Sequence, residues 1–127
     1  MTQQRGGTAA GDYAIERTVF EEAQRTWATF TVDAFSSEAS AMVSRYWTKT
    51  KSLGAEGNDS LHVDRWRNVW GAGEVVWAHP PIELLVPLTQ VLVRHDRYAE
   101  TVVCCPLWSS AKWFRELDSI ADDQFRY

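Results

Sequence analysis

The sequence lacks the long apolar run that a membrane-spanning segment requires. Its longest uncharged apolar stretch, residues 84–93, contains Pro87 and Gln90 and is only about half of the ~20 residues that a bilayer-spanning helix needs. The first thirty residues carry no apolar region typical of a secretory leader. We therefore expect neither a membrane protein nor an exported one.

Positive charge is also scarce. The chain has 13 lysines and arginines against 17 aspartates and glutamates, which leaves a net charge of −4 at pH 7. Free-standing proteins that bind duplex DNA usually carry a basic stripe, because neutralising phosphates supplies most of their non-specific affinity. No such stripe is visible here, so nucleic-acid binding would need a local patch or a larger assembly.

Only two cysteines are present, Cys104 and Cys105, and they are adjacent. Consecutive Cα atoms lie about 3.8 Å apart, below the usual disulfide range of roughly 4.4–6.8 Å, so the two do not readily pair. On a strand their side chains would point to opposite faces. We expect reduced, buried thiols and an intracellular protein, cytoplasmic or nuclear. The histidines have no partners at ligand spacing, so no metal site is expected.

The 127 residues suffice for one domain. Polar, glycine-rich residues 1–11 predict a flexible tail, and residues 12–127 a single domain. Short β-rich runs predict strands at 30–35, 74–78 and 101–105, and residues 48–60 read as a loop. Apolar residues at helical spacing predict helices that begin at Asp12, near Val86, and at Ser109 or Ser110. Because of Pro87, the second helix either starts near Val86 directly or follows a short tight turn. This alternation predicts an α/β fold with a small, mostly parallel sheet covered on both sides.

The residues that could bind a ligand or take part in a reaction follow the carboxyl ends of the predicted strands. In open α/β sheets, ligands bind in the crevice beyond these ends. If the strands are parallel, residues 33–37, 79–82 and 106–109 become neighbours and bring together a carboxylate (Asp33), an imidazole (His79), two prolines and an indole (Trp108). The alternative is that each segment simply ends a strand, with Asp33 capping the turn that follows it.

Tryptophan is abundant, with seven in the chain. Trp66 and Trp70 lie in D-R-W-R-N-V-W, interleaved with Arg65 and Arg67. Together with Trp108, these residues form a candidate surface for nucleic acid or another partner, because indole and guanidinium planes stack on bases. The alternative is an amphipathic turn whose arginines extend their charged ends to solvent.

Five strings occur in order: W-A-T-F-T-V-D-A-F (27–35), D-S-L…W (59–66), V-V-W-A-H-P-P-I (75–82), V-V-C-C-P-L-W (102–108) and A-K-W-F-R-E-L (111–117). This series resembles phage-type DNA N-6-adenine methyltransferases. It is most similar to the methyltransferase-like domain of DIRS-type retroelement polyproteins. The resemblance covers residues 12–120. It implies a three-layer, Rossmann-like fold that uses S-adenosylmethionine (AdoMet), with the diproline loop as the active site.

The resemblance places His79, Pro80, Pro81 and Ile82 at the family's catalytic N-P-P-Y loop, and Asp33 at its cofactor site. In the family, the asparagine and the first proline's carbonyl hold the amine of a flipped adenine, and the aromatic residue stacks on the base. Here His79 replaces the asparagine, Ile82 replaces the aromatic residue, and no glycine-rich AdoMet loop is present. These departures imply a degenerate site, with no cofactor expected.

We therefore expect a retroelement-derived, methyltransferase-like module that binds nucleic acid or protein. One alternative is an active AdoMet-dependent DNA adenine methyltransferase, in which case AdoMet is its cofactor. A second is a structural protein that forms homodimers. Similar methyltransferases continue with further strands beyond the position of Phe125, so the sheet is expected to be truncated, and an exposed sheet edge favours pairing with another chain.

Overall fold

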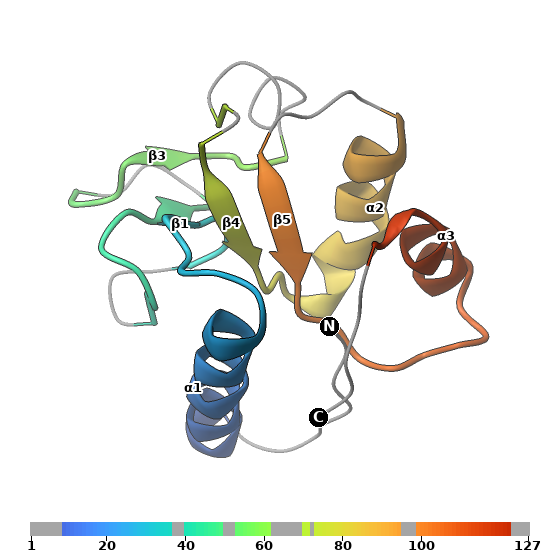
Figure 1. Cartoon of the computed structure of the whole chain (residues 1–127), viewed down its shortest axis with the longest axis horizontal. Coiled ribbons are helices and arrows are strands. Elements are labelled where there is room, and N and C mark those ends of the chain that lie inside the picture. Colours follow the sequence, from blue (N-terminus) through green and yellow to red (C-terminus); the bar gives the residue numbers. More distant parts are fainter. Residues whose placement is uncertain are drawn as a thin grey trace.

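The computed structural model describes residues 9–36, 40–49, 53–61, 70–71, 73–94 and 99–122. In chain order the elements are α1 (Ala9–Thr26), β1 (Val32–Asp33), β2 (Trp47–Thr48), β3 (Gly57–Asn58), β4 (Val75–Ala78), the 3₁₀ helix η2 (Ile82–Leu84), α2 (Leu85–Arg94), β5 (Glu100–Val103) and α3 (Lys112–Ile120). In the described ranges, α1 is followed by four strands, and α2 and α3 flank β5 in sequence (Figure 1). The predicted α/β class is confirmed.

All strand pairs in the described ranges are parallel. One group has the order β1-β4-β5, and β2 and β3 form a second pair. A parallel bridge between Asp33 and Tyr46 joins the two groups, and the Asp33 amide donates to the Arg45 carbonyl at 2.9 Å. The neighbours therefore run β3-β2-β1-β4-β5. From β1, the chain adds β2 and β3 on one side of the sheet. It then crosses back and adds β4 and β5 on the other side of β1.

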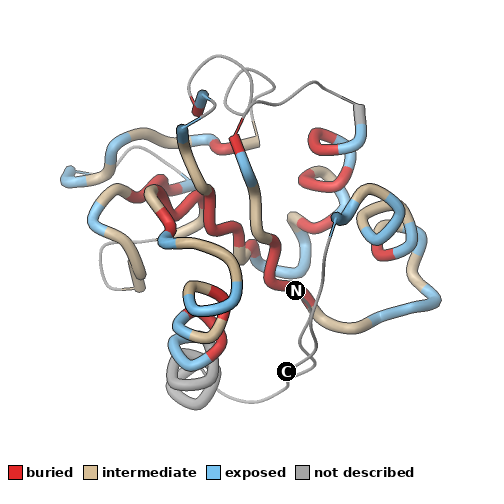
Figure 2. Tube along the Cα trace, viewed as in Figure 1, coloured by how far each residue is buried: buried red, intermediate tan, exposed pale blue. Residues whose placement is uncertain are grey.

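Helices cover both faces of this sheet. On one face, α1 packs against Trp77 of β4 and against Cys104, in a cluster that also contains Phe20 and Phe30. On the other face, α2 and α3 pack against a larger cluster that includes Cys105. Figure 2 shows that β4 and β5 are buried toward their carboxyl ends and more exposed toward their amino ends. The two cysteines point to opposite faces, as predicted. No helix in the described ranges is long and apolar enough to cross a bilayer.

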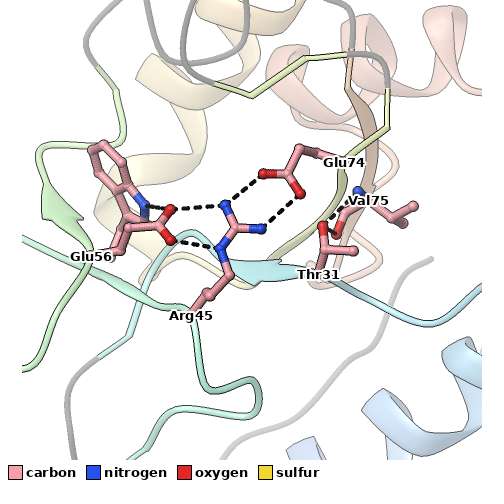
Figure 3. Close-up of polar contacts among 6 residues, drawn as sticks. Thr31, Arg45, Glu56, Glu74 and Val75 are labelled. Carbon is pink, nitrogen blue, oxygen red and sulfur yellow. Dashed lines mark hydrogen bonds and ion pairs between the residues drawn. The ribbon is translucent and has the colours of Figure 1, made fainter.

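Ion pairs between one arginine and two glutamates link the amino ends of β2, β3 and β4 (Figure 3). The Arg45 guanidinium, just before β2, binds both carboxylate oxygens of Glu56, at 2.6 and 3.0 Å, and both of Glu74, at 2.8 and 2.6 Å. Glu56 precedes β3 and also accepts from the Trp47 indole at 3.1 Å. Glu74 precedes β4. One arginine therefore ties three strand starts, and we call this set the amino-edge clamp.

Several predicted boundaries were wrong. Helix α1 begins at Ala9, three residues before Asp12, because alanines at positions 9 and 10 favour helix strongly. The expected loop at residues 48–60 contributes to β2 and contains β3, two-residue strands that only neighbouring backbones define. Helix α3 starts after Ala111, without a side-chain cap from either serine. Helix α2 starts at Leu85, close to the expected position, with Pro87 in its first turn, where proline is tolerated.

Position 57 in β3 requires glycine because the Trp47 ring lies close to its backbone. A Cβ added there would lie 2.5 Å from the Trp47 ring, so the ring must move. We expect Gly57→Ala to lower the free energy of unfolding by about 1–3 kcal/mol, the usual cost of overpacking. Urea denaturation measures the change. Gly73→Ala, whose Cβ meets nothing within 4 Å, is the control, and an equal loss in both variants would contradict this packing.

Candidate functional site

The parallel pairing brings the predicted segments to one edge of the sheet. The Ala34 amide donates to the Trp77 carbonyl at 2.9 Å, and the Cys104 amide to the Ala78 carbonyl at 2.9 Å. These bonds continue the ladder to the carboxyl ends of β1, β4 and β5. The chain leaves these ends into residues 34–36, 79–82 and 104–108 respectively. We call this the carboxyl edge, and it lies at the opposite end of the strands from the amino-edge clamp.

Asp33, at the end of β1, is turned inward. Its side chain is only 2 % exposed, and its two carboxylate oxygens accept from the Phe35 amide at 3.3 Å and the Met42 amide at 3.1 Å. Burial raises its pKa to about 6, although hydrogen bonds from Met42, Phe35 and Ser36 partly offset the effect. The carboxylate holds the turn after β1, which favours the capping role over a cofactor role.

The diproline loop begins directly at the end of β4. The His79 ring is half-buried and lies edge-on to Trp77, with centroids 6.4 Å apart. Because Trp77 is the register partner of Asp33, His79 lies two positions further along the same face of the sheet. Pro80 is buried and Pro81 is exposed. Ile82, which opens η2, is 54 % exposed.

Trp108 follows β5 at the same edge. Its side chain is 41 % exposed, and its ring lies edge-on to Trp113 of α3, with centroids 6.1 Å apart. Its amide donates to the Pro106 carbonyl at 3.0 Å, and its carbonyl accepts from the Ala111 amide at 2.9 Å. The indole is thus held on a hydrogen-bonded turn with much of its surface in solvent.

The predicted tryptophan and arginine surface is not assembled as expected. Trp70 is fully buried, edge-on to Trp47 with centroids 5.2 Å apart, so it presents no face for stacking. Its inclusion in an exposed surface was wrong, because the indole fills the core beside β2. Arg65, Trp66 and Arg67 lie outside the described residues.

Two features of the edge escaped the sequence reasoning. The exposure of Ile82 and Val86, two apolar residues that follow β4, was not predicted. Val86 was the available indication, because an apolar residue one turn after Ile82 marks a second apolar face. In addition, the Ser60 hydroxyl, in the D-S-L string, donates to the Ala34 carbonyl and joins that string to the end of β1.

Among the described residues, no group of three or more histidines, cysteines, aspartates or glutamates is arranged to bind a metal ion. Asp33 already accepts from the backbone through both oxygens. No protein-family model, curated protein or solved structure matches the chain. Function must therefore be argued from the edge itself.

Proposed function

We propose that this chain is a methyltransferase-like binding module of retroelement origin, which binds a protein partner at its carboxyl edge and transfers no methyl group. The neighbour order β3-β2-β1-β4-β5 supports a Rossmann-like architecture, since it matches the doubly wound arrangement. In such sheets the ligand crevice lies where the strand order reverses, which here is between β1 and β4.

One observation carries the proposal: exposed apolar side chains lie in the segments that leave the carboxyl ends of β4 and β5. The described residues expose five large apolar side chains, namely Leu53, Ile82, Val86, Val93 and Trp108. Ile82 follows β4 and Trp108 follows β5, its neighbour in the sheet, and Val86 lies in the first turn of α2. Exposed apolar side chains, with a tryptophan among them, are typical of protein-binding surfaces.

The residues of the diproline loop favour binding over catalysis. A neutral imidazole at His79 accepts one hydrogen bond and a protonated one accepts none, whereas the family's amide oxygen accepts reliably. Ile82 has no π-face on which an adenine could stack. Both oxygens of Asp33 are bonded to backbone amides, and the diproline loop keeps the carbonyl of Pro80 but lacks the family's amide and aromatic side chains.

A protein partner suits this edge better than nucleic acid. The charged residue between Ile82 and Val86 is the exposed Glu83, which would repel phosphate. The net charge of −4 acts in the same direction. Burial of Trp70 also removes one stacking platform that single-stranded nucleic acid would need.

The test uses the unaltered chain and its edge variants as baits for affinity capture from extracts of the protein's native cells. Quantitative mass spectrometry then compares the proteins that each bait retains. Proteins retained by the unaltered chain should be lost with both Ile82→Ser and Trp108→Ala, and kept with the control Leu53→Ser. Leu53 is 96 % exposed and lies three residues before Glu56 of the amino-edge clamp. Truncating a central tryptophan typically costs at least about 2 kcal/mol, or roughly a 30-fold loss of affinity.

Two outcomes would contradict the proposal. A set of captured proteins unchanged in both edge variants would show that the edge is not the binding surface. Tight binding of a single-stranded oligonucleotide that both variants abolish would favour nucleic acid as the partner instead. Fluorescence anisotropy with a labelled oligonucleotide provides that second measurement.

A second candidate function is an active AdoMet-dependent methyltransferase. The observation in its favour is the buried Asp33, whose pKa is raised at the point of strand-order reversal, since such groups concentrate at functional sites. The double variant His79→Asn with Ile82→Tyr restores the family's loop. We expect no transfer of labelled methyl from AdoMet to adenine in DNA by this variant, and measurable transfer would favour the enzyme.

A further inference from the structure

An exposed arginine is bonded to the same turn that carries the exposed indole of Trp108. The Arg115 guanidinium donates to the Ser110 carbonyl at 2.5 Å, and the Trp108 carbonyl accepts from the Ala111 amide at 2.9 Å. Ser110 follows Trp108 by two residues, which span at most about 7 Å of backbone. The turn before α3 (residues 108–111) therefore carries an apolar ring and holds a positive charge within one short stretch of chain.

A second cation extends this charge along α3. Lys112 lies three positions before Arg115, so the two side chains leave the helix on the same side. The Lys112 side chain is 84 % exposed, and 3.7 Å separates its ammonium from the Glu116 carboxylate. Such exposed pairs contribute little, so the ammonium can bind a second carboxylate. In the described part of the chain, the Arg115 guanidinium donates to Ser110 alone, and its other N–H groups can bind a partner.

The indole supplies the apolar part of this surface. The Trp108 ring lies edge-on to Trp113, which packs against the larger core cluster, so the exposed ring rests on a side chain anchored in that core. Large, rigid aromatic side chains lose little conformational entropy when a partner covers them. A partner therefore needs an apolar side chain for the indole and negative charge for the two cations beside it.

The distribution of charge on α3 favours single carboxylates over a chain of phosphates. Lys112 and Arg115 are followed by Glu116 and by the exposed Asp118, so the two cations do not continue into a basic stripe. A run of phosphates along the helix would meet these carboxylates, which repel it. One carboxylate, in contrast, matches the planar guanidinium through two parallel hydrogen bonds.

We propose that the turn before α3, together with Arg115 and Lys112, binds an acidic peptide segment. In this complex an apolar side chain of the segment packs on the Trp108 indole, and a neighbouring carboxylate pairs with the Arg115 guanidinium. Lys112 adds attraction for further negative charge. The acidic segment belongs to the protein partner proposed above, so its identity rests on the proposed function.

Selection from a random peptide library displayed on phage, with the full chain immobilised, tests this assignment. We expect the enriched peptides to carry aspartate or glutamate beside a large apolar residue, and to be lost with Trp108→Ala. Selection on Arg115→Gln should no longer favour acidic residues. The matched control is Arg25→Gln, which removes the same charge from the exposed ion pair of Arg25 with Glu22 on α1 and should enrich the same peptides as the unaltered chain.

A double-mutant cycle separates a direct contact from a loosened turn. Fluorescence anisotropy measures the affinity of a labelled, enriched peptide and of the same peptide with its acidic residue replaced by the corresponding amide. Arg115→Gln should weaken the acidic peptide about tenfold and leave the affinity of the amide peptide nearly unchanged. An equal loss for both peptides would overturn the assignment, because Arg115 would then only support the turn.

Three further results would overturn the acidic segment, and they bear differently on the proposed function. Enriched peptides that need Trp108 but carry no acidic residue would leave the edge as a protein-binding surface. No enrichment, or equal binding to Trp108→Ala, would contradict the proposed function as well. Tighter binding of a labelled single-stranded oligothymidylate, lost in both Arg115→Gln and Trp108→Ala, would identify nucleic acid as the partner.

Discussion

Replacing Trp77 with alanine is expected to lower the free energy of unfolding by about 3–5 kcal/mol, the usual range for truncating a buried tryptophan. Trp77 lies in the middle of the sheet on β4 and is fully buried. Its ring packs edge-on against Phe20 of α1, with centroids 5.2 Å apart, and at a tilt against Phe30, with centroids 5.1 Å apart. The variant leaves a cavity where α1 meets the sheet. It therefore loses both the free energy of burying the indole away from water and the packing contacts of the ring.

Urea denaturation followed by circular dichroism measures this loss. For a domain of this length, 3–5 kcal/mol corresponds to a fall in melting temperature of about 10–20 °C. Trp77→Phe is the control, because it keeps an aromatic ring against Phe20 and should lose markedly less stability. A loss below about 1 kcal/mol in Trp77→Ala would contradict the packing of α1 on this face.

Replacing Arg45 with methionine is expected to cost about 2 kcal/mol at pH 7. The variant keeps the length and apolar part of the side chain but removes four hydrogen bonds to Glu56 and Glu74. Charge-assisted, paired hydrogen bonds of this geometry are stronger than neutral ones. Arg45 is 42 % exposed, and solvent screening keeps the cost below that of breaking a buried ion pair.

The effect of Arg45→Met should depend on pH in a defined direction. Hydrogen bonds from Arg45 lower the pKa of both Glu56 and Glu74 from the ordinary value of 4.5. Their contribution is fully present above that value and is lost as pH falls through the lowered pKa values. The stability difference between variant and unaltered protein should therefore be constant from pH 7 to about pH 5 and shrink below pH 4.5.

A matched control for the clamp is Lys112→Met. Lys112 forms a solvent-exposed ion pair with Glu116 on α3, with 3.7 Å between charged atoms. Exposed helical pairs contribute about 0.3–0.5 kcal/mol, so this variant should hardly change the urea midpoint. If Arg45→Met is no more destabilising than Lys112→Met, the amino-edge clamp does not hold the strand starts together.

The parts of the fold that the sequence predicted are those with long local patterns. The apolar runs before His79 and Pro106 gave β4 and β5, because buried parallel strands are apolar on both faces and end where proline removes a donor. Helix α2 followed from its apolar spacing and from Pro87. In contrast, β2 and β3 are two residues each and exist through pairing with distant backbones, which no local pattern records.

Strand direction was enough to predict which segments lie at the carboxyl edge of the sheet. Parallel strands carry their following loops to one edge, so Asp33, His79 and Trp108 were expected near one another. Side-chain orientation was not predictable in the same way. Whether Trp70 faces the core or solvent depends on the space beside Trp47, and whether Asp33 faces a ligand or its own backbone depends on the path taken by residues 40–43.

The claim that the carboxyl edge is a partner surface and not a cofactor site is tested most directly by a thermal melt with and without 1 mM AdoMet. The account predicts no change in the melting temperature. If AdoMet bound with a dissociation constant near 10 μM, linkage would add about 2.7 kcal/mol and raise the midpoint by about 10 °C. A rise of that size would contradict the account and make Asp33 and His79 candidate residues of an active methyltransferase.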